Sequence, residues 1–591
     1  MPTKNKYLKQ ILLWRYQFIS ERQFIYVLSV LVGLLAGLGT AVLKNLTFFF
    51  ENLLEGKFIK DFHYSLYFIF PIIGLILVYY IKRKMIKKEI GHGIPTTLHA
   101  VSKKNGIIDK YKMYASLITA PVTVGFGGSA GLQGPAVSTG AALGSYVAQL
   151  FHMSAKTRML LIGCATAGAM SSMFKAPVAA IVFAVEIFSL DLAFASLVPL
   201  LLASVSAVIT SYFFFEKDAL FGFQLIDAFE IKDVLYYIIL GLGTGVASVY
   251  FSKIYFRITK FFNHFKKPIH RLILGGIAIG IMLYFIPPLY GEGYGLINNL
   301  LNGNTADALA TLPYKVDLTN IWIVIAFLIL IALFKAIAMT TTFAAGGVGG
   351  IFIPTLFMGA SLGNVFAKII NALGGNVSES NFTLIGMTGL MAGVLHAPLT
   401  AIFLIAEITG GYDLFVPLML VAAISFAFTK YFIANSIYTT ELAKRGELIT
   451  HNKDKNVMMM MKIDRLIEDN FKTIHPEMLL GDMLKSAVAK STRNIFPVTN
   501  ADKVFLGIVL LDDIRPFMFD TEMYNNVTVE TLMKAAPEII FYEDSVTEIM
   551  KKFKTSDAWN LPVVQGDKYV GFISKSKLLT AYRNKLIEVT S

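Results

Sequence analysis

Two glycine-rich segments, each leading into a proline-started helix, contain the residues of this sequence that are best suited to binding a ligand. The first runs from Gly125 to Gly144 and includes Pro135, which favours the first turn of a helix. Backbone N–H groups at a helix start lack partners within the helix, and the positive end of the helix dipole lies there. The segment therefore suits an anion inside a membrane protein, although a close crossing of helices through Gly140 and Gly144 explains the same residues.

A second copy of this pattern indicates an internal duplication. The segment Gly349–Gly363 places Pro354 and two glycines at the same spacing as in the first copy. Further along, residues 176–186 match residues 397–407, and each of these segments has an Ala-Pro pair near its start and ends in a glutamate. Paired interrupted helices in two halves indicate a binding site near the middle of a transporter fold.

The composition predicts a polytopic membrane protein that lies in a lipid bilayer. The 591 residues are 55% hydrophobic and 16% charged, with a mean hydropathy of +0.60, whereas soluble proteins carry about 25% charged residues. The net charge of +13 does not indicate nucleic-acid binding, because the basic residues lie mostly at the ends of apolar runs. The single Cys164 excludes an intrachain disulfide.

No enzyme chemistry is indicated. The nine histidines show no metal-ligand spacing, and no phosphate-loop lysine motif is present, so we expect no catalytic residue, no metal site and no required cofactor.

The N-terminal region predicts a cytoplasmic start. Residues 1–22 contain a basic amphipathic stretch, which lies on the cytoplasmic face or simply leads into the first span. The first two spans are expected near 23–50 and 65–81, and a lysine- and arginine-rich cluster follows at 82–88. The positive-inside rule then places the N-terminus and this cluster on the cytoplasmic side. No cleavable signal peptide is evident, because the first apolar run lacks a small-residue cleavage site.

The transport domain is expected at 23–450, with halves at about 23–215 and 233–435. Several apolar segments in it are too short to cross about 30 Å of hydrocarbon squarely. Broken or re-entrant helices explain their length, provided that protein covers their ends. In the first half, apolar segments are expected near 112–126, 133–150, 157–172, 176–190 and 193–215.

Three motifs in this order resemble the CLC family of chloride channels and anion/proton antiporters. They are Gly91-His92-Gly93-Ile94-Pro95, Gly131-Leu132-Gln133-Gly134-Pro135 and Gly350-Ile351-Phe352-Ile353-Pro354, and Ser436-Ile437-Tyr438 resembles the segment with the family's pore tyrosine. The resemblance covers about residues 20 to 450. It implies an all-α polytopic domain with inverted repeats and broken helices. It also implies a homodimer in which each protomer has its own pathway for chloride or another small anion.

The resemblance also implies where the anions bind. A central anion would meet the backbone N–H groups of Ile351 and Phe352 and the hydroxyl of Tyr438, and an outer anion would meet amides around Gln133 and Gly134. The implied anion-binding residues are His92, Gly93, Ile94, Gln133, Gly134, Ile351, Phe352 and Tyr438.

Three residues depart from the family pattern. Gln133 stands at the gate position, where antiporters of the family have a glutamate, and it does not titrate; it could also make a simple hydrogen bond in its loop. Ile187 stands where antiporters generally have an inner proton-relay carboxylate, whereas the adjacent Glu186 is expected to order local structure, like Glu407 in the other repeat. His92 replaces a usual serine, and it either faces the anion or bonds a backbone carbonyl.

Residues 456–591 have a soluble composition and contain a weaker duplication, at about 456–520 and 526–591. Each copy is predicted to form helix, strand, strand and helix, which resembles a cytoplasmic α/β tandem CBS pair. Such pairs often bind adenine nucleotides, with an aspartate at the position of Asp513 on the ribose. The second copy has Lys577 there, which weakens that site, and a purely structural module for dimerisation is the alternative.

These observations favour an anion channel or uncoupled uniporter of the CLC type, because carboxylates are missing at Gln133 and Ile187. The alternative is an anion/proton exchanger with a different proton route through His92. A sensor with a vestigial pore is disfavoured by the intact third motif and Tyr438. We expect a multi-pass protein of a bacterial inner membrane with both termini in the cytoplasm.

Overall fold

The computed structural model describes residues 17–54, 63–88, 90–91, 93–188, 194–214, 229–313, 317–409, 411–444, 458, 461 and 463–590. The chain divides into two compact units, Met1–Arg445 and Gly446–Ser591. Most of the expected amphipathic N-terminal segment lies outside the described residues, as does His92.

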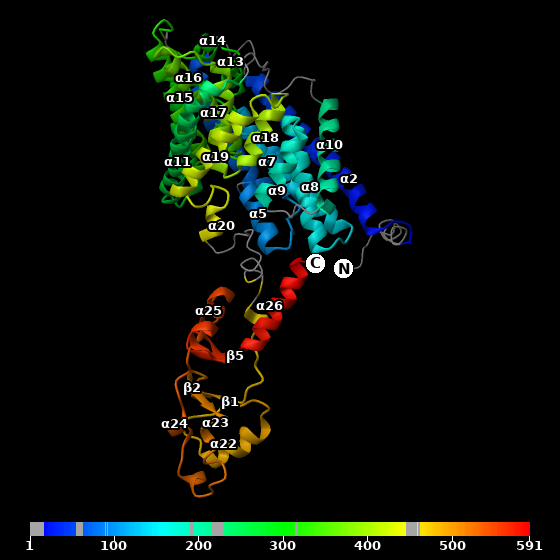
Figure 1. Ribbon diagram of the computed structural model, residues 1–591, viewed down its shortest axis with the longest axis vertical. Coiled ribbons are helices and arrows are strands. Elements are labelled where there is room, and N and C mark those ends of the chain that lie inside the picture. The colour runs from blue at the N-terminus through cyan, green and yellow to red at the C-terminus, as the bar shows by residue number, and fades with distance from the viewer. Residues whose placement is uncertain are drawn as a thin grey trace. The chain divides into compact units, whose positions relative to one another are not determined.

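The N-terminal unit is helical, and its first half supplies two of the three helix starts at the site (Figure 1). The helices of this half are α2 (Glu21–Leu54), α4 (His63–Tyr80), α5 (Ile94–Lys103), α6 (Lys112–Gly125), α7 (Gln133–Leu150), α8 (Ala155–Phe174), α9 (Pro177–Phe188) and α10 (Phe194–Phe214), with a π-helical turn at Ile81–Ile86. The predicted segments 112–126, 133–150 and 193–215 are confirmed as α6, α7 and α10.

The second half repeats this arrangement and adds a short C-terminal helix. Its helices are α11 (Val234–Asn263), α12 (Pro268–Phe285), α13 (Tyr294–Leu301), α14 (Thr305–Leu309), α15 (Ile321–Ala344), α16 (Phe352–Ala372), α17 (Glu379–Leu395), α18 (Pro398–Ile408), α19 (Phe415–Phe432) and α20 (Thr440–Lys444). The pairs α7–α8 and α16–α17 occupy equivalent places in the two halves.

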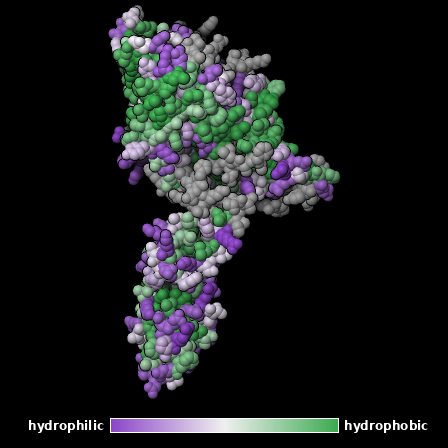
Figure 2. Space-filling view, viewed as in Figure 1, coloured by the Kyte–Doolittle hydropathy of each residue, from purple (hydrophilic) through white to green (hydrophobic). Residues whose placement is uncertain are grey.

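The surface and helix lengths fit a membrane environment. Seven helices of the described part are long and apolar enough to cross a membrane, whereas α9 and α18 are short apolar helices. Large hydrophobic side chains such as Leu34, Leu201 and Ile273 are exposed on the outer faces of these helices. Figure 2 shows hydrophobic residues across much of the visible face of this unit. The apolar surface is what a lipid bilayer would cover.

Reciprocal contacts show that the two halves are related by an approximate two-fold axis. Glu186 at the end of α9 accepts hydrogen bonds from Leu399 N and Thr400 N, at 3.2 and 2.8 Å, in the first turn of α18. Glu407 at the end of α18 accepts from Val178 N and Ala179 N, at 3.2 and 2.8 Å, in the first turn of α9. The prediction that Glu186 orders local structure is therefore confirmed, since each carboxylate caps the opposite helix.

Glycines allow the paired helices to touch along their backbones. A Cβ atom on Gly140 would lie 2.7 Å from Ala165 O of α8, and one on Gly363 would lie 2.0 Å from Phe382 O of α17. Both distances are too short for a side chain, so the close-packing interpretation of these glycines holds. It is compatible with ligand binding, because the packing glycines lie further along each helix than the glycines at its start.

The C-terminal unit contains the predicted succession of helix, strand, strand and helix in both copies. In the first copy β1 (Ile495–Thr499) pairs antiparallel with β2 (Phe505–Leu510), flanked by α22 (Leu480–Ser486) and α23 (Leu511–Ile514). The second copy follows α24 (Val529–Leu532) and consists of β3 (Ile540–Phe541), α25 (Val546–Ser556), β4 (Asn560–Gln565), β5 (Lys568–Ser574) and α26 (Lys575–Thr590). In its sheet β4 lies between β3, which is parallel to it, and β5, which is antiparallel.

An apolar cluster joins the two copies. It contains Phe471, Ile495, Ile508 and Phe572, and the rings of Phe471 and Phe572 lie 4.6 Å apart. Backbone hydrogen bonds between Glu468 and Phe572 tie the segment that precedes the first copy to the sheet of the second. The two copies therefore form one folded unit.

Candidate anion site

Three helix starts from distant parts of the sequence meet at one point. Gly93 is the N-cap of α5, Gly134 lies in the first turn of α7, and Gly350 directly precedes the N-cap of α16. A Cβ atom on Gly93 would lie 2.8 Å from Gly134 O, and one on Gly350 would lie 2.6 Å from Gly134 N. Gly93 also has a φ of 55°, which favours glycine. Only glycines permit this close approach.

Symmetric hydrogen bonds hold the two longer loops together. Gly131 and Gly350 form an antiparallel bridge, in which each backbone N–H donates to the other residue's carbonyl, at 2.9 and 2.6 Å. Thr342 Oγ1 at the end of α15 accepts from Ser129 N, and Thr123 Oγ1 at the end of α6 accepts from Val348 N. Each loop is thus fixed by a threonine of the other half.

The predicted binding residues occupy the first turns of these helices. Gln133 and Gly134 open α7, Ile351 is the N-cap of α16 and Phe352 is its first residue, while Ile94 opens α5. N–H groups in a first turn have no intrahelical acceptor, and three positive helix ends reinforce one another here. The arrangement can therefore bind an anion through backbone amides.

Tyr438 contributes a buried hydroxyl close to this region. Tyr438 precedes the start of α20 at Thr440, and α20 packs against α5. Only 5% of Tyr438 is exposed. Its hydroxyl has no hydrogen-bond partner among the described residues. A buried polar group of this kind requires a partner, and an anion would supply one.

Gln133 is also buried, and it meets a carboxylate that sequence reasoning missed. Its Nε2 donates to Glu292 Oε1 at 3.4 Å and to the Tyr294 hydroxyl at 3.3 Å. The same Glu292 oxygen accepts the backbone N–H of Leu132 at 2.9 Å. The hydrogen bonds that Gln133 makes are thus not to its own loop, but to Glu292 and Tyr294, about 160 residues away in the sequence.

Two buried lysines accompany Glu292. Lys335 of α15 is fully buried, and its Nζ donates to Gly291 O at 2.9 Å and to Leu289 O at 3.3 Å. Lys335 and the buried Lys44 of α2 both interact electrostatically with Glu292. Lys335 is the single charged residue of the 24-residue helix α15. A charge in such a segment is a sign of function and could have directed attention to this cluster.

Ile187 lies on α9, directly after Glu186, and it is partly buried. Glu186 is held at the start of α18, where Thr400 Oγ1 also donates to it at 2.6 Å. Because residue 187 is an isoleucine, the position after Glu186 has no group that can bind a proton.

A basic cavity of about 860 Å³ lies beside the first motif. It adjoins Gly91, and its lining includes Lys82, Arg83, Lys87, Lys88 and Arg271. Positive charge in a concave surface raises the local concentration of anions.

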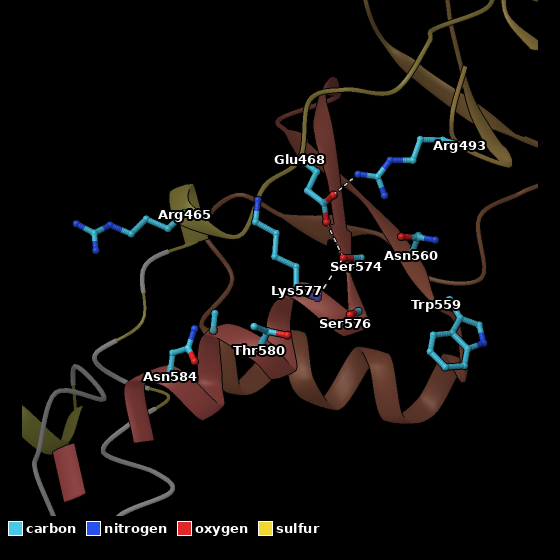
Figure 3. A pocket seen from close by; sticks show the side chains of 11 residues that line it. Arg465, Glu468, Arg493, Trp559, Asn560, Ser574, Ser576, Lys577, Thr580 and Asn584 are labelled. Atoms are coloured by element: carbon cyan, nitrogen blue, oxygen red, sulfur yellow. Dashed lines mark hydrogen bonds and ion pairs between the residues drawn. The ribbon is translucent and has the colours of Figure 1, made fainter. Parts of the chain in front are cut away.

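The C-terminal unit has a second cavity, of about 610 Å³, between β5 and α26 (Figure 3). Basic side chains of Arg465, Arg493 and Lys577 line it together with hydroxyls of Ser574, Ser576 and Thr580. Figure 3 shows the chain of contacts from Arg493 through Glu468 to Ser574. Lys577 Nζ donates to Ile467 O at 3.0 Å.

The contacts of Glu468 determine its charge. Burial raises the pKa of its carboxyl, but hydrogen bonds from Ser574 and Arg493 outweigh that effect and leave the pKa below its usual range. Asp513, the predicted ribose ligand, is not among the residues that line this cavity, and its Oδ1 accepts from Lys534 Nζ at 2.7 Å. Its counterpart Lys577 does line it.

No group of three or more His, Cys, Asp and Glu side chains within the described ranges is arranged to hold a metal ion.

Together, the apolar helices and the meeting helix starts define a polytopic membrane transport protein with a site suited to an anion. A profile of the voltage gated chloride channel family matches residues 73–430, and a CBS domain profile matches residues 529–584. The chain belongs to the voltage gated chloride channel family, that is, the CLC family, whose members are transport proteins.

Relatives in bacteria include both kinds of CLC protein. A protein of Ralstonia nicotianae named as a ClcB-like chloride channel protein is 29% identical over 362 residues, which is 60% of this chain and 80% of that protein. The H(+)/Cl(-) exchange transporter ClcA of Salmonella paratyphi B is 26% identical over 442 residues, which is 71% of this chain and 88% of that protein.

Solved structures confirm the fold. A slow cyanobacterial Cl-/H+ antiporter superposes with a TM-score of 0.61 at 20% identity and covers 72% of this chain and 98% of its own. A eukaryotic CLC transporter superposes with a TM-score of 0.60 at 17% identity and covers 94% of this chain and 97% of its own. The CLC-like fold with a C-terminal CBS region is therefore established.

Proposed function

We propose that this protein conducts chloride or another small anion across the membrane without stoichiometric coupling to protons. The observation that carries the proposal is the meeting of three helix starts at Gly93, Gly134 and Gly350, with a neutral Gln133 in the first turn of α7. In this proposal the anion binds the backbone amides of α7 and α16, and the hydroxyl of Tyr438 completes the central site.

The absence of coupling follows from the two substituted positions. Coupled exchange needs a group that occupies the anion site when it is charged and leaves the site when it binds a proton. It also needs an inner group that passes the proton on. The amide of Gln133 imitates only a protonated carboxyl, and Ile187 cannot accept a proton. Protons that bind elsewhere can then change the rate of anion flow, but an anion gradient does not drive them uphill.

Purified protein in liposomes tests this proposal. A chloride gradient should produce anion flux that a chloride electrode records, while a pH-sensitive dye reports no uphill proton movement. Sustained proton pumping that a proton ionophore abolishes would establish exchange and refute the uncoupled mechanism. The absence of any anion flux would refute the transport function itself.

The proposal extends to the assembly and its orientation. Two protomers form a homodimer, each with its own pathway, and both termini face the cytoplasm of a bacterial cell. The basic residues Lys82, Arg83 and Lys87 near Gly91 support a cytoplasmic position for this end of the pathway, because basic residues are retained on that side.

We also propose that the C-terminal unit binds an adenine nucleotide. The cavity of about 610 Å³ supports this, since Arg493, Lys577 and nearby hydroxyls suit phosphate, and the exposed Trp559 at its edge suits a base. Calorimetry of the whole protein with ATP, ADP and AMP tests the proposal. A lack of heat change with all three would leave the unit a structural role.

A further inference from the structure

We propose that Glu292, rather than residue 133, is the titratable group that competes with the anion at the outer site. The inference rests on the proposed function, since it requires that an anion binds at the start of α7. It assigns to a glutamate of the α12–α13 connection the role of a pH-dependent gate.

The contacts of Glu292 place its charge at the helix start. Its Oε1 accepts the N–H of Leu132, the N-cap residue of α7, at 2.9 Å, and the Gln133 amide at 3.4 Å. Only 8% of Glu292 is exposed. A carboxylate therefore already uses one amide of the set that an outer anion would use, and it does so from a loop about 160 residues away in the sequence.

The groups around Glu292 allow it to be ionised inside the protein. Lys335 from α15 and Lys44 from α2 attract the carboxylate, and Lys335 Nζ also fixes the loop through Gly291 O at 2.9 Å. Tyr294 from α13 faces it through Gln133, and Glu51 from α2 reaches the same loop, since a Cβ on Gly291 would lie 3.4 Å from Glu51 Oε1. Buried charges need such partners.

Competition follows from these contacts. An anion at the amides of Gln133 and Gly134 would lie beside the carboxylate of Glu292. Two negative charges that are neighbours in a buried site repel each other strongly. Protonation removes the charge of Glu292. If the Gln133 amide turns by half a rotation, its Oε1, which has no partner among the described residues, takes the place of Nε2 and can accept the new O–H. Acid should therefore favour anion entry, whereas neutral pH should oppose it.

This gating does not produce exchange. The proton that binds Glu292 leaves by the route by which it came, because Ile187 offers no acceptor along α9. Flux then depends on pH while the stoichiometry of proton transport stays at zero.

The test measures chloride flux from liposomes that contain the whole protein, between about pH 4.5 and about pH 7.5, where a buried carboxyl titrates. Wild-type flux should rise roughly fivefold to tenfold on acidification, because the like charge that repels the anion is removed. Glu292→Gln should give high flux at both pH values. Glu407→Gln serves as the matched control, since Glu407 caps α9 instead, and its pH profile should follow the wild type.

A further variant keeps the test decisive. If Glu292→Gln does not fold, Glu292→Asp keeps a titratable group on a shorter side chain, and its profile should shift to lower pH with weaker inhibition at neutral pH. A flat wild-type profile, or an unchanged profile in both Glu292 variants, would overturn the inference while anion flux itself upholds the proposed function. Absence of flux in the wild type would overturn both proposals.

Discussion

Replacing Gly350 by alanine should disrupt the anion site while leaving the fold intact. The new Cβ would lie 2.6 Å from Gly134 N and 3.2 Å from Gly134 Cα, whereas ordinary van der Waals contact begins at 3.4 Å. Both neighbouring atoms belong to the backbone, so no side chain can rotate away. Either the start of α7 moves away from α16, or the methyl group covers the N–H of Gly134.

The magnitude follows from the hydrogen bond that is lost. A hydrogen bond to a charged group contributes about 1.5–3 kcal/mol. Because about 1.4 kcal/mol corresponds to a factor of ten, anion affinity should fall by roughly tenfold to 150-fold. Over-packing in a tight core costs a further ~1–3 kcal/mol of stability, which a large membrane domain can tolerate.

Calorimetric titration with chloride and flux from liposomes measure these effects. Gly39→Ala is the control, because its Cβ would lie 3.5 Å from Thr139 Cγ2 and 3.8 Å from Leu143 Cδ1, both at ordinary contact distance. The control should bind and transport chloride like the wild type. If Gly350→Ala is folded and binds chloride with wild-type affinity, the three helix starts are not the anion site.

Three other predictions concern individual side chains. His92→Ser should shift relative permeability among chloride, nitrate and fluoride several-fold, because a charge-assisted bond contributes about 1.5–3 kcal/mol; unchanged selectivity at acidic and neutral pH would place the imidazole off the pathway. Lys577→Ala should weaken adenine nucleotide binding with the dimer intact, because Lys577 lines the cavity, whereas calorimetry in which only Asp513→Ala weakens it would assign binding to the first copy instead. The lowered pKa of Glu468 means that its stabilisation is present above its unfolded pKa of about 4.3 and is lost as pH falls through the folded value. Acid below about pH 4 should therefore destabilise the C-terminal unit, which thermal unfolding measures as a lower melting temperature. Glu468→Gln should weaken this dependence of stability on pH.

Much of the fold could be predicted because local patterns determine it. Proline and glycine at fixed spacings predict where α7 and α16 begin. The internal duplication by itself indicates that Glu186 and Glu407, which occupy equivalent positions in the two halves, have the same role. The structure adds that each of these carboxylates caps the helix that carries the other. Short apolar runs predicted broken helices because no segment of that length spans a bilayer alone.

The surroundings of Gln133 could not be predicted in the same way. The contact between Leu132 and Glu292 joins segments about 160 residues apart, and it depends on how the loop before α13 packs against α15. No periodicity marks a single glutamate between two glycines. Lys335, by contrast, is an isolated charge in the apolar segment of α15, a signal that the sequence analysis passed over and that a search for its counter-charge could have extended to Glu292.

The identity of residue 133 now has a physical reason. A glutamate there would place a second carboxylate where the Gln133 amide donates to Glu292 Oε1 at 3.4 Å, and two such groups cannot both be ionised without a large cost. Gln133→Glu alone should therefore produce a coupled pair, of which one member stays protonated at neutral pH, and a pH-dependent flux without exchange, because Ile187 still interrupts the proton route. The double variant Gln133→Glu with Glu292→Gln restores one donor and one carboxylate in exchanged places. The double variant should be more stable than Gln133→Glu in thermal unfolding. Its flux should follow the titration of a single group, whereas the flux of Gln133→Glu should follow two coupled groups. Equal stability of the single and double variants would show that the two side chains do not interact, and the amide at position 133 would then have no connection with the charge of Glu292.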